Sequence, residues 1–201
     1  MIVVLGAGGT GRSIMAAIPS HVDAVFLDDR VPEGVINGRK NLGALDRIHT
    51  LGEIEPIVGF GCLFLARRKE LFLELTEKYP MAHVIHHAAV VEGSAAVGAG
   101  TYLAPFVVVM PNAVVGRNVV VCTHASIDHD CVVGDHAYIS PGVNLAGGVR
   151  VGESVFLGTN ATVLPQLEIG AHATIGAGAV VTRNVAPGAT VAGVPARGMK
   201  A

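Results

Sequence analysis

The chain has 201 residues, of which 51% are hydrophobic and only 4% aromatic, and its formal net charge at neutral pH is −2. Without a basic excess, neither a nucleic acid nor an anionic membrane surface is an expected partner. The apolar runs are broken by Pro, Asn or charge short of a membrane span, and the first residues lack the features of a signal peptide, so we expect a soluble, cytoplasmic protein.

The first 84 residues alternate between strand and helix patterns. Short apolar runs bounded by glycine or acidic residues predict strands, and apolar residues at helical spacing predict helices. The predicted strands are residues 1–6, 23–29, 55–61 and, as a possible fourth, 82–87, while the predicted helices begin at residue 9 and span residues 67–79. This order predicts a small α/β domain over residues 1–84, with a parallel sheet.

A glycine-rich turn follows the first predicted strand. The sequence Gly6-Ala7-Gly8-Gly9-Thr10-Gly11 opens the first helix, where glycines permit close approach of a ligand and the helix N-terminus favours a pyrophosphate. Asp28 and Asp29 end the second strand, where an acidic residue often meets a ribose or a base edge. Taken alone this pattern indicates NAD binding, but residues 1–84 hold only half of a doubly wound dinucleotide fold.

From Ile85 onward the sequence has a strict period of six. Seventeen consecutive positions of this period are aliphatic: Ile85, Val91, Val97, Leu103, Val109, Val115, Val121, Ile127, Val133, Ile139, Leu145, Val151, Leu157, Val163, Ile169, Ile175 and Val181. A hexapeptide period is the signature of a parallel β-helix, in which the aliphatic side chains point inward and three hexads make a coil of about 18 residues. We therefore expect about five coils within a second domain, residues 85–201.

A polar stretch, Asp128-His129-Asp130, lies within this repeat. Because Ile127 occupies an inward position, the three polar residues fall at the next corner, which carries His129 outward. Histidine has a pKa near neutrality that suits a general base, and a flanking carboxylate can orient the imidazole. His129 is therefore a candidate base with Asp130 beside it, and a solvated corner histidine is the alternative interpretation.

The repeats, followed by GAGAVVTRNVAPGATVAGVPAR, resemble the bacterial hexapeptide acyltransferases. With GAGGTGR, VFLDD and IDHDCVVGD, nearly the whole chain resembles the PglD/NeuD type of sugar acetyltransferase in that superfamily. The resemblance implies a left-handed β-helix that uses acetyl-CoA, a half-Rossmann-like α/β domain that binds a nucleotide-linked amino sugar, and a homotrimer with active sites between subunits. It further implies N-acetylation, typically of a 4-amino-deoxy sugar, for surface glycan biosynthesis, with no metal ion.

The resemblance also implies roles for individual residues. His129 corresponds to the general base, and Asp130 to the acidic residue that follows it. The implied contacts of the coenzyme are Tyr138, in place of a histidine of the resembled proteins, and Gly147, Thr159, Ala177 and Pro195. The implied contacts of the nucleotide-linked sugar are Gly8, Gly9, Thr10, Asp28 and Asp29. Three basic residues are expected near the phosphates of the coenzyme: Arg183, Arg197 and Lys200.

The sequence is compatible with three other functions. A sialic-acid-type sugar O-acetyltransferase needs the same base, because hydroxyl and amine acceptors both lose a proton. A metal lyase of the γ-carbonic-anhydrase type is the second alternative, because the spacing of His124 and His129 resembles two of its three ligands, although Ala88 occupies the third position. A non-catalytic trimeric scaffold is the third. We expect His136 and His172 to be solvated corner residues, while His124 could line the same cleft as His129.

Overall fold

The computed structural model describes residues 1–199 and divides the chain into two compact units, Met1–Val84 and the residues from Ile85 onward. Lys200, one of the expected phosphate contacts, lies outside the described residues. No helix within residues 1–199 has the length and apolar character needed to cross a membrane. The cytoplasmic location stays a prediction.

The first unit is built on a five-stranded sheet in the order β3-β4-β2-β1-β5. Strands β1 (Ile2–Leu5), β2 (Ala24–Leu27) and β5 (Glu55–Val58) run parallel, as the apolar runs predict. Helix α1 (Gly9–Ala17) follows β1, and helix α2 (Leu65–Thr76) follows β5. Because parallel strands end at the same edge of a sheet, the loops after β1, β2 and β5 lie along one edge.

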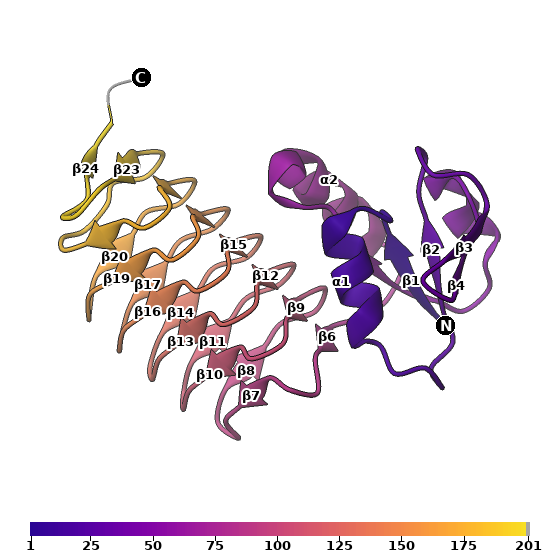
Figure 1. Cartoon of the computed structure of the whole chain (residues 1–201), viewed down its shortest axis with the longest axis horizontal. Helices are drawn as coiled ribbons and strands as arrows, with labels where there is room; N and C mark the ends of the chain where they lie inside the picture. Colours follow the sequence, from indigo (N-terminus) through magenta and orange to yellow (C-terminus); the bar gives the residue numbers. More distant parts are fainter. Residues whose placement is uncertain (200–201) are drawn as a thin grey trace. The chain divides into compact units, whose positions relative to one another are not determined.

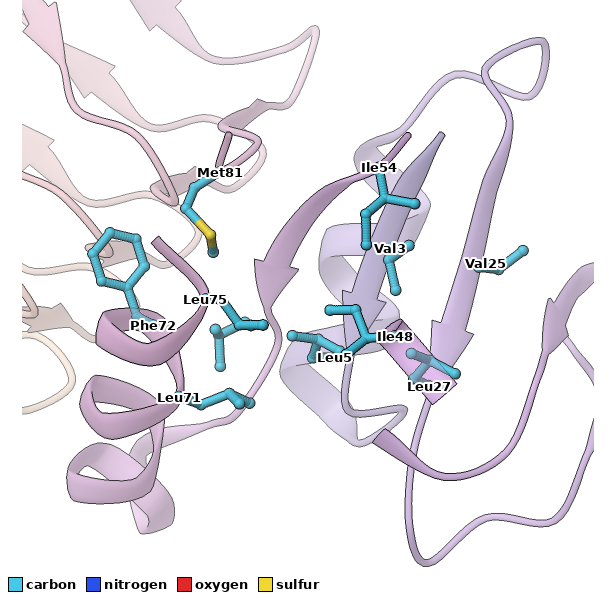
Figure 2. Packing of buried hydrophobic residues seen from close by; sticks show 11 residues of the cluster. Val3, Leu5, Val25, Leu27, Ile48, Ile54, Leu71, Phe72, Leu75 and Met81 are labelled. Atoms are coloured by element: carbon cyan, nitrogen blue, oxygen red, sulfur yellow. The ribbon is translucent and has the colours of Figure 1, made fainter. Parts of the chain in front are cut away.

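Apolar side chains join α2 to one face of this sheet. Val3 and Leu5 of β1 belong to one cluster with Ile48 and with Leu71 and Leu75 of α2, and all five are at most 6% exposed. Figure 2 shows Leu71 and Leu75 projecting from α2 toward Leu5 of β1. Burying each such aliphatic side chain contributes about 1.5–3 kcal/mol, which holds α2 over the end of β1.

An edge hairpin makes the sheet mixed, whereas the sequence predicted a parallel one. Strands β3 (Gly34–Ile36) and β4 (Arg39–Asn41) pair antiparallel, and β4 joins the sheet beside β2. The turn residues Asn37 and Gly38 have φ values of 50° and 79°, which is typical of a two-residue hairpin loop. Both strands are only three residues long and β4 is polar, so apolar runs do not reveal the pair, although Asn-Gly is a hairpin signal.

The connections include two 3-10 helices, η1 (Leu45–Thr50) and η2 (Cys62–Phe64). The possible fourth strand at residues 82–87 does not belong to the α/β sheet. Only Val84–Ile85 form a strand there, β6, and it belongs to a sheet of the β-helix. Ile85 is also the first position of the period of six, which accounts for this placement.

The second unit is a parallel β-helix of stacked coils (Figure 1). Each strand pairs in register with the strands one coil before and after it, as Val108 pairs with Val90 and Ser126. Three faces result: the first contains β7, β10, β13, β16, β19 and β22, the second contains β8, β11, β14, β17 and β20, and the third contains β6, β9, β12, β15, β18, β21, β23 and β24.

The strands of the regular coils are two residues long and lie at the predicted positions. They are β7 (Val90–Val91), β8 (Ala96–Val97), β9 (Tyr102–Leu103), β10 (Val108–Val109), β11 (Val114–Val115), β12 (Val120–Val121), β13 (Ser126–Ile127), β14 (Val132–Val133), β15 (Tyr138–Ile139), β16 (Asn144–Leu145), β17 (Arg150–Val151), β18 (Phe156–Leu157), β19 (Thr162–Val163), β20 (Glu168–Ile169), β21 (Thr174–Ile175) and β22 (Val180–Val181). An antiparallel pair, β23 (Thr190–Ala192) and β24 (Arg197–Gly198), follows them. From Leu103 to Val181 the aliphatic positions of the period are at most 3% exposed.

The corners between the faces use a left-handed backbone conformation. Every sixth residue from Gly100 to Gly178 has a φ between 52° and 74°, and most of these residues are not glycine. Asn, Asp and His tolerate this conformation better than most residues do, which explains their frequency at the corners. The polar corner positions therefore follow from the geometry of the coil.

Candidate active site

His129 lies at the corner between the first and second faces, after β13 and before β14. Ile127 is fully buried, whereas His129 and Asp130 are exposed. The Asp128 Oδ1 atom accepts a hydrogen bond of 2.7 Å from the His129 N–H group, and Asp130 has a φ of 59°. The corner therefore carries the imidazole out of the coil, as predicted.

The imidazole of His129 is hydrogen-bonded to the carboxylate of Asp130, with 2.8 Å between Nδ1 and Oδ2. We assign the proton to Nδ1, because an ionised carboxylate only accepts, and this leaves the Nε2 lone pair available. Asn112 Nδ2 donates to the other oxygen, Asp130 Oδ1, over 3.1 Å. The bond to Asp130 and then the charge of Asp128 raise the pKa of His129, and the bonds from His129 and Asn112 lower the pKa of Asp130.

Gly147, an implied coenzyme contact, lies against the Nε2 edge of His129. It occupies the same corner one coil later, where the Gly148 N–H group donates to the His129 carbonyl oxygen over 2.9 Å. A Cβ atom at Gly147 would lie 2.6 Å from both Cε1 and Nε2 of the imidazole. Only glycine therefore leaves room for the ring over this part of the backbone.

Other implied coenzyme contacts lie elsewhere on the β-helix. Thr159 and Ala177 are exposed, one coil apart, at the corner between the third and first faces. Tyr138 of β15 lies on the third face, where it is 7% exposed, stacks against Phe156, and accepts a hydrogen bond from Cys122 Sγ over 3.6 Å. Within one chain, the corner of Thr159 and Ala177 borders the face of Tyr138, whereas His129 lies at the opposite end of the first face.

The C-terminal residues form a small cavity of about 210 Å³. Its lining includes Arg183 and Arg197, two of the expected phosphate contacts, and β24 contributes to it. Pro195 is exposed in the turn between β23 and β24. Two guanidinium groups beside one cavity can bind phosphate oxygens.

The other histidines singled out in the β-helix occupy different corners from His129. His124 is exposed between the third and first faces, edge-on to Phe106 with 5.0 Å between the ring centroids. His136, predicted to be solvated, is only 7% exposed, and its Nδ1 atom lies 2.8 Å from Asn118 Nδ2. That partner satisfies the ring where water does not reach it. His172 is exposed, as predicted. Among residues 1–199 no group of three or more His, Cys, Asp or Glu side chains is placed to hold a metal ion.

In the first unit, the glycine-rich loop leaves open space at the start of α1. Gly8 and Gly9 are exposed, and a Cβ atom added to either would have no neighbour within 4 Å. A Cβ atom on Gly11 would instead overlap the Gly6 carbonyl oxygen, so Gly11 serves packing. The half-buried Thr10 directs its hydroxyl toward the loop after β5, where a Cβ atom on Gly61 would lie 2.9 Å from Oγ1. The N-terminal N–H groups of α1 can thus receive an anion from solvent.

The two aspartates after β2 differ in their contacts. Asp28 Oδ2 accepts the Ala7 N–H group over 2.6 Å, and Oδ1 accepts the N–H groups of Arg30 and Val31 over 2.8 and 3.1 Å. Asp28 therefore fixes the glycine-rich loop and the turn after β2. Asp29 is exposed, and its Oδ1 atom accepts the Leu45 N–H group over 2.8 Å. Asp29 is the member of the pair that keeps an oxygen for a ligand.

A cavity of about 380 Å³ lies beside Asp29, and the sequence analysis did not identify it. Its lining combines apolar residues, among them Leu5, Ile48, Leu71 and Leu75, with four charged ones: Asp29, Asp46, Arg67 and Glu74. Asp46 belongs to η1 and Glu74 to α2, which are separated in the sequence by β5. Only the fold brings them together, so no local motif could have indicated the cavity.

A parallel β-helix of hexapeptide coils, with a His–Asp pair exposed at one corner, places the protein among the hexapeptide-repeat transferases. The family model described as bacterial transferase hexapeptide (six repeats) matches residues 148–183, within the β-helix. No curated protein sequence gives a significant match.

Three solved structures match nearly the whole chain. The acetyltransferase domain of PglB from Neisseria gonorrhoeae is 33% identical, with a TM-score of 0.92 and 98% of each chain covered. PerB from Caulobacter crescentus, solved with CoA and GDP-perosamine, is 28% identical, with a TM-score of 0.91 and coverage of 99% of this chain and 97% of that chain. WeeI from Acinetobacter baumannii is 28% identical, with a TM-score of 0.90 and 99% of each chain covered. The protein therefore belongs to the sugar N-acetyltransferases of the hexapeptide-repeat superfamily, and its β-helix is left-handed.

Proposed function

We propose that the protein transfers the acetyl group of acetyl-CoA to the amino group of a nucleotide-linked amino sugar, a 4-amino-deoxy sugar used for surface glycans. The observation that carries the proposal is the hydrogen-bonded His129–Asp130 pair at an exposed corner, with Gly147 beside the Nε2 atom. The ligands of PerB, CoA and GDP-perosamine, are a coenzyme and a nucleotide-linked amino sugar of this kind.

His129 acts as the general base in a direct transfer. The amine nitrogen attacks the thioester carbonyl, a C–N bond forms, and His129 Nε2 takes the proton that the nitrogen loses. The C–S bond then breaks, and the proton on the imidazole passes to the leaving thiolate of the coenzyme. Asp130 keeps the other ring nitrogen protonated and stabilises the imidazolium, as the carboxylate of a catalytic triad does. The N–H group of Gly147 polarises the thioester carbonyl, whereas that of Gly148 already donates to the His129 carbonyl oxygen.

In the first unit, we propose that the nucleotide-linked sugar binds along the edge where β1 and β2 end. The accessible N–H groups at Gly8, Gly9 and Thr10 receive the diphosphate. Asp29 accepts hydrogen bonds from the nucleotide, while Asp28 holds the loop in shape. The implied contact at Asp28 is thereby reinterpreted as a positioning role.

We also propose a homotrimer in which each active site combines two chains. Within one chain, Thr159 and Ala177 lie at a different corner from His129. A groove that offers all three to one coenzyme molecule requires a second copy, whose other corner faces His129. Tyr138 lies on the third face, beside the corner of Thr159 and Ala177, and its contact with the coenzyme belongs to the same proposal.

The test is thiol release from acetyl-CoA with a panel of nucleotide-linked amino sugars, for wild type, His129→Asn and His172→Asn. We expect release with a 4-amino sugar and a loss of about 10²- to 10⁴-fold in His129→Asn, which is typical of a lost general base. His172→Asn makes the same replacement at an exposed histidine of another corner and should retain wild-type activity.

Turnover that survives His129→Asn would contradict the assignment of the base. Release with hydroxyl acceptors alone would replace N-acetylation by O-acetylation. Absence of both coenzyme binding and release would favour the non-catalytic scaffold.

A further inference from the structure

We infer that the cavity beside Asp29 binds a guanine base, so that the substrate is a guanosine diphosphate sugar. This inference rests on the proposed function, because it identifies the nucleotide that carries the amino sugar. It depends on three properties of the cavity: its shape and apolar wall, the kind of polar atoms in its lining, and its place beside the glycine-rich loop.

The cavity has the volume and walls that a nucleobase requires. About 380 Å³ is available, and Leu5, Leu71 and Leu75 form an apolar floor of small exposed area, since each is at most 6% exposed. A flat aromatic base can place one face against this floor and turn its polar edge toward the charged rim. A diphosphate would instead meet three carboxylates at this rim, those of Asp29, Asp46 and Glu74, so the uncharged end of the nucleotide belongs here.

The polar atoms of the rim are mostly hydrogen-bond acceptors. Asp46 and Glu74 make no hydrogen bond or ion pair with any other residue of the described chain, so all four of their carboxylate oxygens are available. Asp29 keeps one oxygen, since the other accepts the Leu45 N–H group. The donors of the lining are Arg67, which lies 3.5 Å from Glu70, and His49, which keeps Nε2 because its Nδ1 atom lies 3.2 Å from the Tyr79 hydroxyl.

Guanine fits this set of groups better than the other common bases do. Its N1–H and N2–H₂ groups are adjacent donors, which one carboxylate can accept in parallel, as it accepts a guanidinium group. Uracil and thymine have one N–H between two carbonyl oxygens, and a carboxylate facing that edge would meet both acceptors. Adenine and cytosine place a ring acceptor beside their amino group. The remaining acceptors of guanine, O6 and N7, suit the donors Arg67 and His49.

The position of the cavity agrees with the rest of the nucleotide. Asp29 follows β2, where an acidic side chain in related sheets accepts a ribose hydroxyl, and it also lines the cavity. The glycine-rich loop follows β1 at the same edge, with Gly8 and Gly9 exposed to a diphosphate. A single nucleotide can therefore reach from the cavity across Asp29 to the start of α1.

The experiment is calorimetric titration of the full-length protein with GDP, UDP, dTDP and xanthosine diphosphate. We expect GDP to bind at least about tenfold more tightly than UDP or dTDP, the selectivity of one bidentate contact. Asp46→Asn and Glu74→Gln are tested separately, because only one of the two carboxylates accepts both N–H groups of guanine. The variant that removes this carboxylate should weaken GDP binding about ten- to hundredfold. That variant should gain affinity for xanthosine diphosphate, which has a carbonyl oxygen where guanine has its N2 amino group.

Glu77→Gln is the matched control, because it removes a carboxylate three positions beyond Glu74 and outside the cavity lining. It should bind GDP as the wild type does, and unchanged binding of acetyl-CoA verifies that each variant is folded. Tighter binding of UDP or dTDP, or wild-type GDP binding in both cavity variants, would overturn the guanine assignment and leave the proposed acetyl transfer intact. Failure of every nucleotide to bind, together with acetylation of a free amino sugar, would overturn the nucleotide-linked substrate as well.

Discussion

At the scale of single residues, the chemistry of His129 is set by its immediate neighbours. Asp130 accepts a hydrogen bond from Nδ1 of His129, and Asn112 donates one to Asp130. Gly147 leaves space at Nε2. The resemblance of IDHDCVVGD to known enzymes predicted the first of these contacts, because the two residues are adjacent in the sequence. The other two could not be predicted locally, since Asn112 and Gly147 belong to the coils before and after His129.

Replacing Asp130 with Asn should move the pH dependence of the reaction. The hydrogen bond to Asp130 raises the pKa of His129, because it favours the protonated imidazole, and the base works only when it is neutral. Without the carboxylate the pKa falls, so the rise of kcat/KM with pH should occur at a lower pH than in the wild type. The plateau should also fall, on the order of tenfold or more, because the ring loses its orienting partner.

A pH–rate profile of kcat/KM measures both effects. Glu168→Gln, which makes the same change of charge on the second face, should leave the profile unchanged. An unmoved acidic limb in Asp130→Asn would mean that a group other than His129 controls it.

Replacing Gly147 with Ala should impair catalysis more than folding. The new methyl group would lie 2.6 Å from the imidazole Nε2 atom, so the ring must turn away from its position over the next coil. We expect kcat/KM to fall about tenfold or more, since misplacement of a base by about 1 Å can cost a hundredfold.

The control for this substitution is Gly93→Ala, at the same corner three coils earlier, where an added Cβ atom has no neighbour within 4 Å. It should retain wild-type activity. Steady-state kinetics and thermal unfolding of both variants separate a local displacement from a loss of stability. Wild-type kinetics in Gly147→Ala would mean that the imidazole works from another rotamer.

At the scale of elements, the period of six determines the strands, the buried positions and the corners of the β-helix together. The sequence therefore predicted every strand from β7 to β22, because each repeats one local rule. The α/β unit follows no such period, and its edge hairpin and 3-10 helices were not predicted. The same difference applies to the sites. The corner residues could be predicted by counting along the period of six, whereas the cavity lined by η1 and α2 depends on long-range packing.

The left-handed corners allow a prediction about stability. Gln166 is exposed at such a corner, with a φ of 60°, and an L side chain is strained there. Gln166→Gly should raise the free energy of unfolding by about 0.5–1 kcal/mol, and Gln166→Val should lower it by about 1–2 kcal/mol because of its branched Cβ.

Urea unfolding of the two Gln166 variants measures this difference. Both replacements remove the same carboxamide, so its loss cannot explain a difference in sign. Equal midpoints for Gly and Val would show that the corner is not held in the left-handed conformation.

At the scale of the whole molecule, the chain offers two chemically different sites on two compact units. The first unit has the acceptor groups and helix N–H groups that we propose to bind a nucleotide, and the second has the His129 corner. Family membership explains why both occur in one chain, since sugar N-acetyltransferases use an acceptor and a donor. The shared active site of the proposed trimer can be tested on the assembled protein.

Mixing two inactive variants should restore activity if each site combines two chains. His129→Ala removes the base from one corner, and Thr159→Trp blocks the corner between the third and first faces. In randomly reassembled trimers, about a quarter of the sites would have both corners intact, so about a quarter of the wild-type activity should return.

The control mixes His129→Ala with Gly147→Trp, which alter the same corner and should not complement each other. Activity after refolding of each mixture is the measurement. No recovery in the first mixture would place the base and the coenzyme contacts in a single chain.

The stacking of Gly147 on His129 has a consequence for how such a gene can change in length. A coil closes after three hexads, so a duplication of one hexad between these residues would move every later corner to the next edge of the β-helix. Gly147 would then no longer lie beside the imidazole, although the new sequence would still fit the repeat and fold. Only whole coils can be gained or lost without exchanging the residues that meet at an edge. Descendants of this chain can therefore lengthen freely beyond the site, whereas within it their length can change only in steps of about 18 residues.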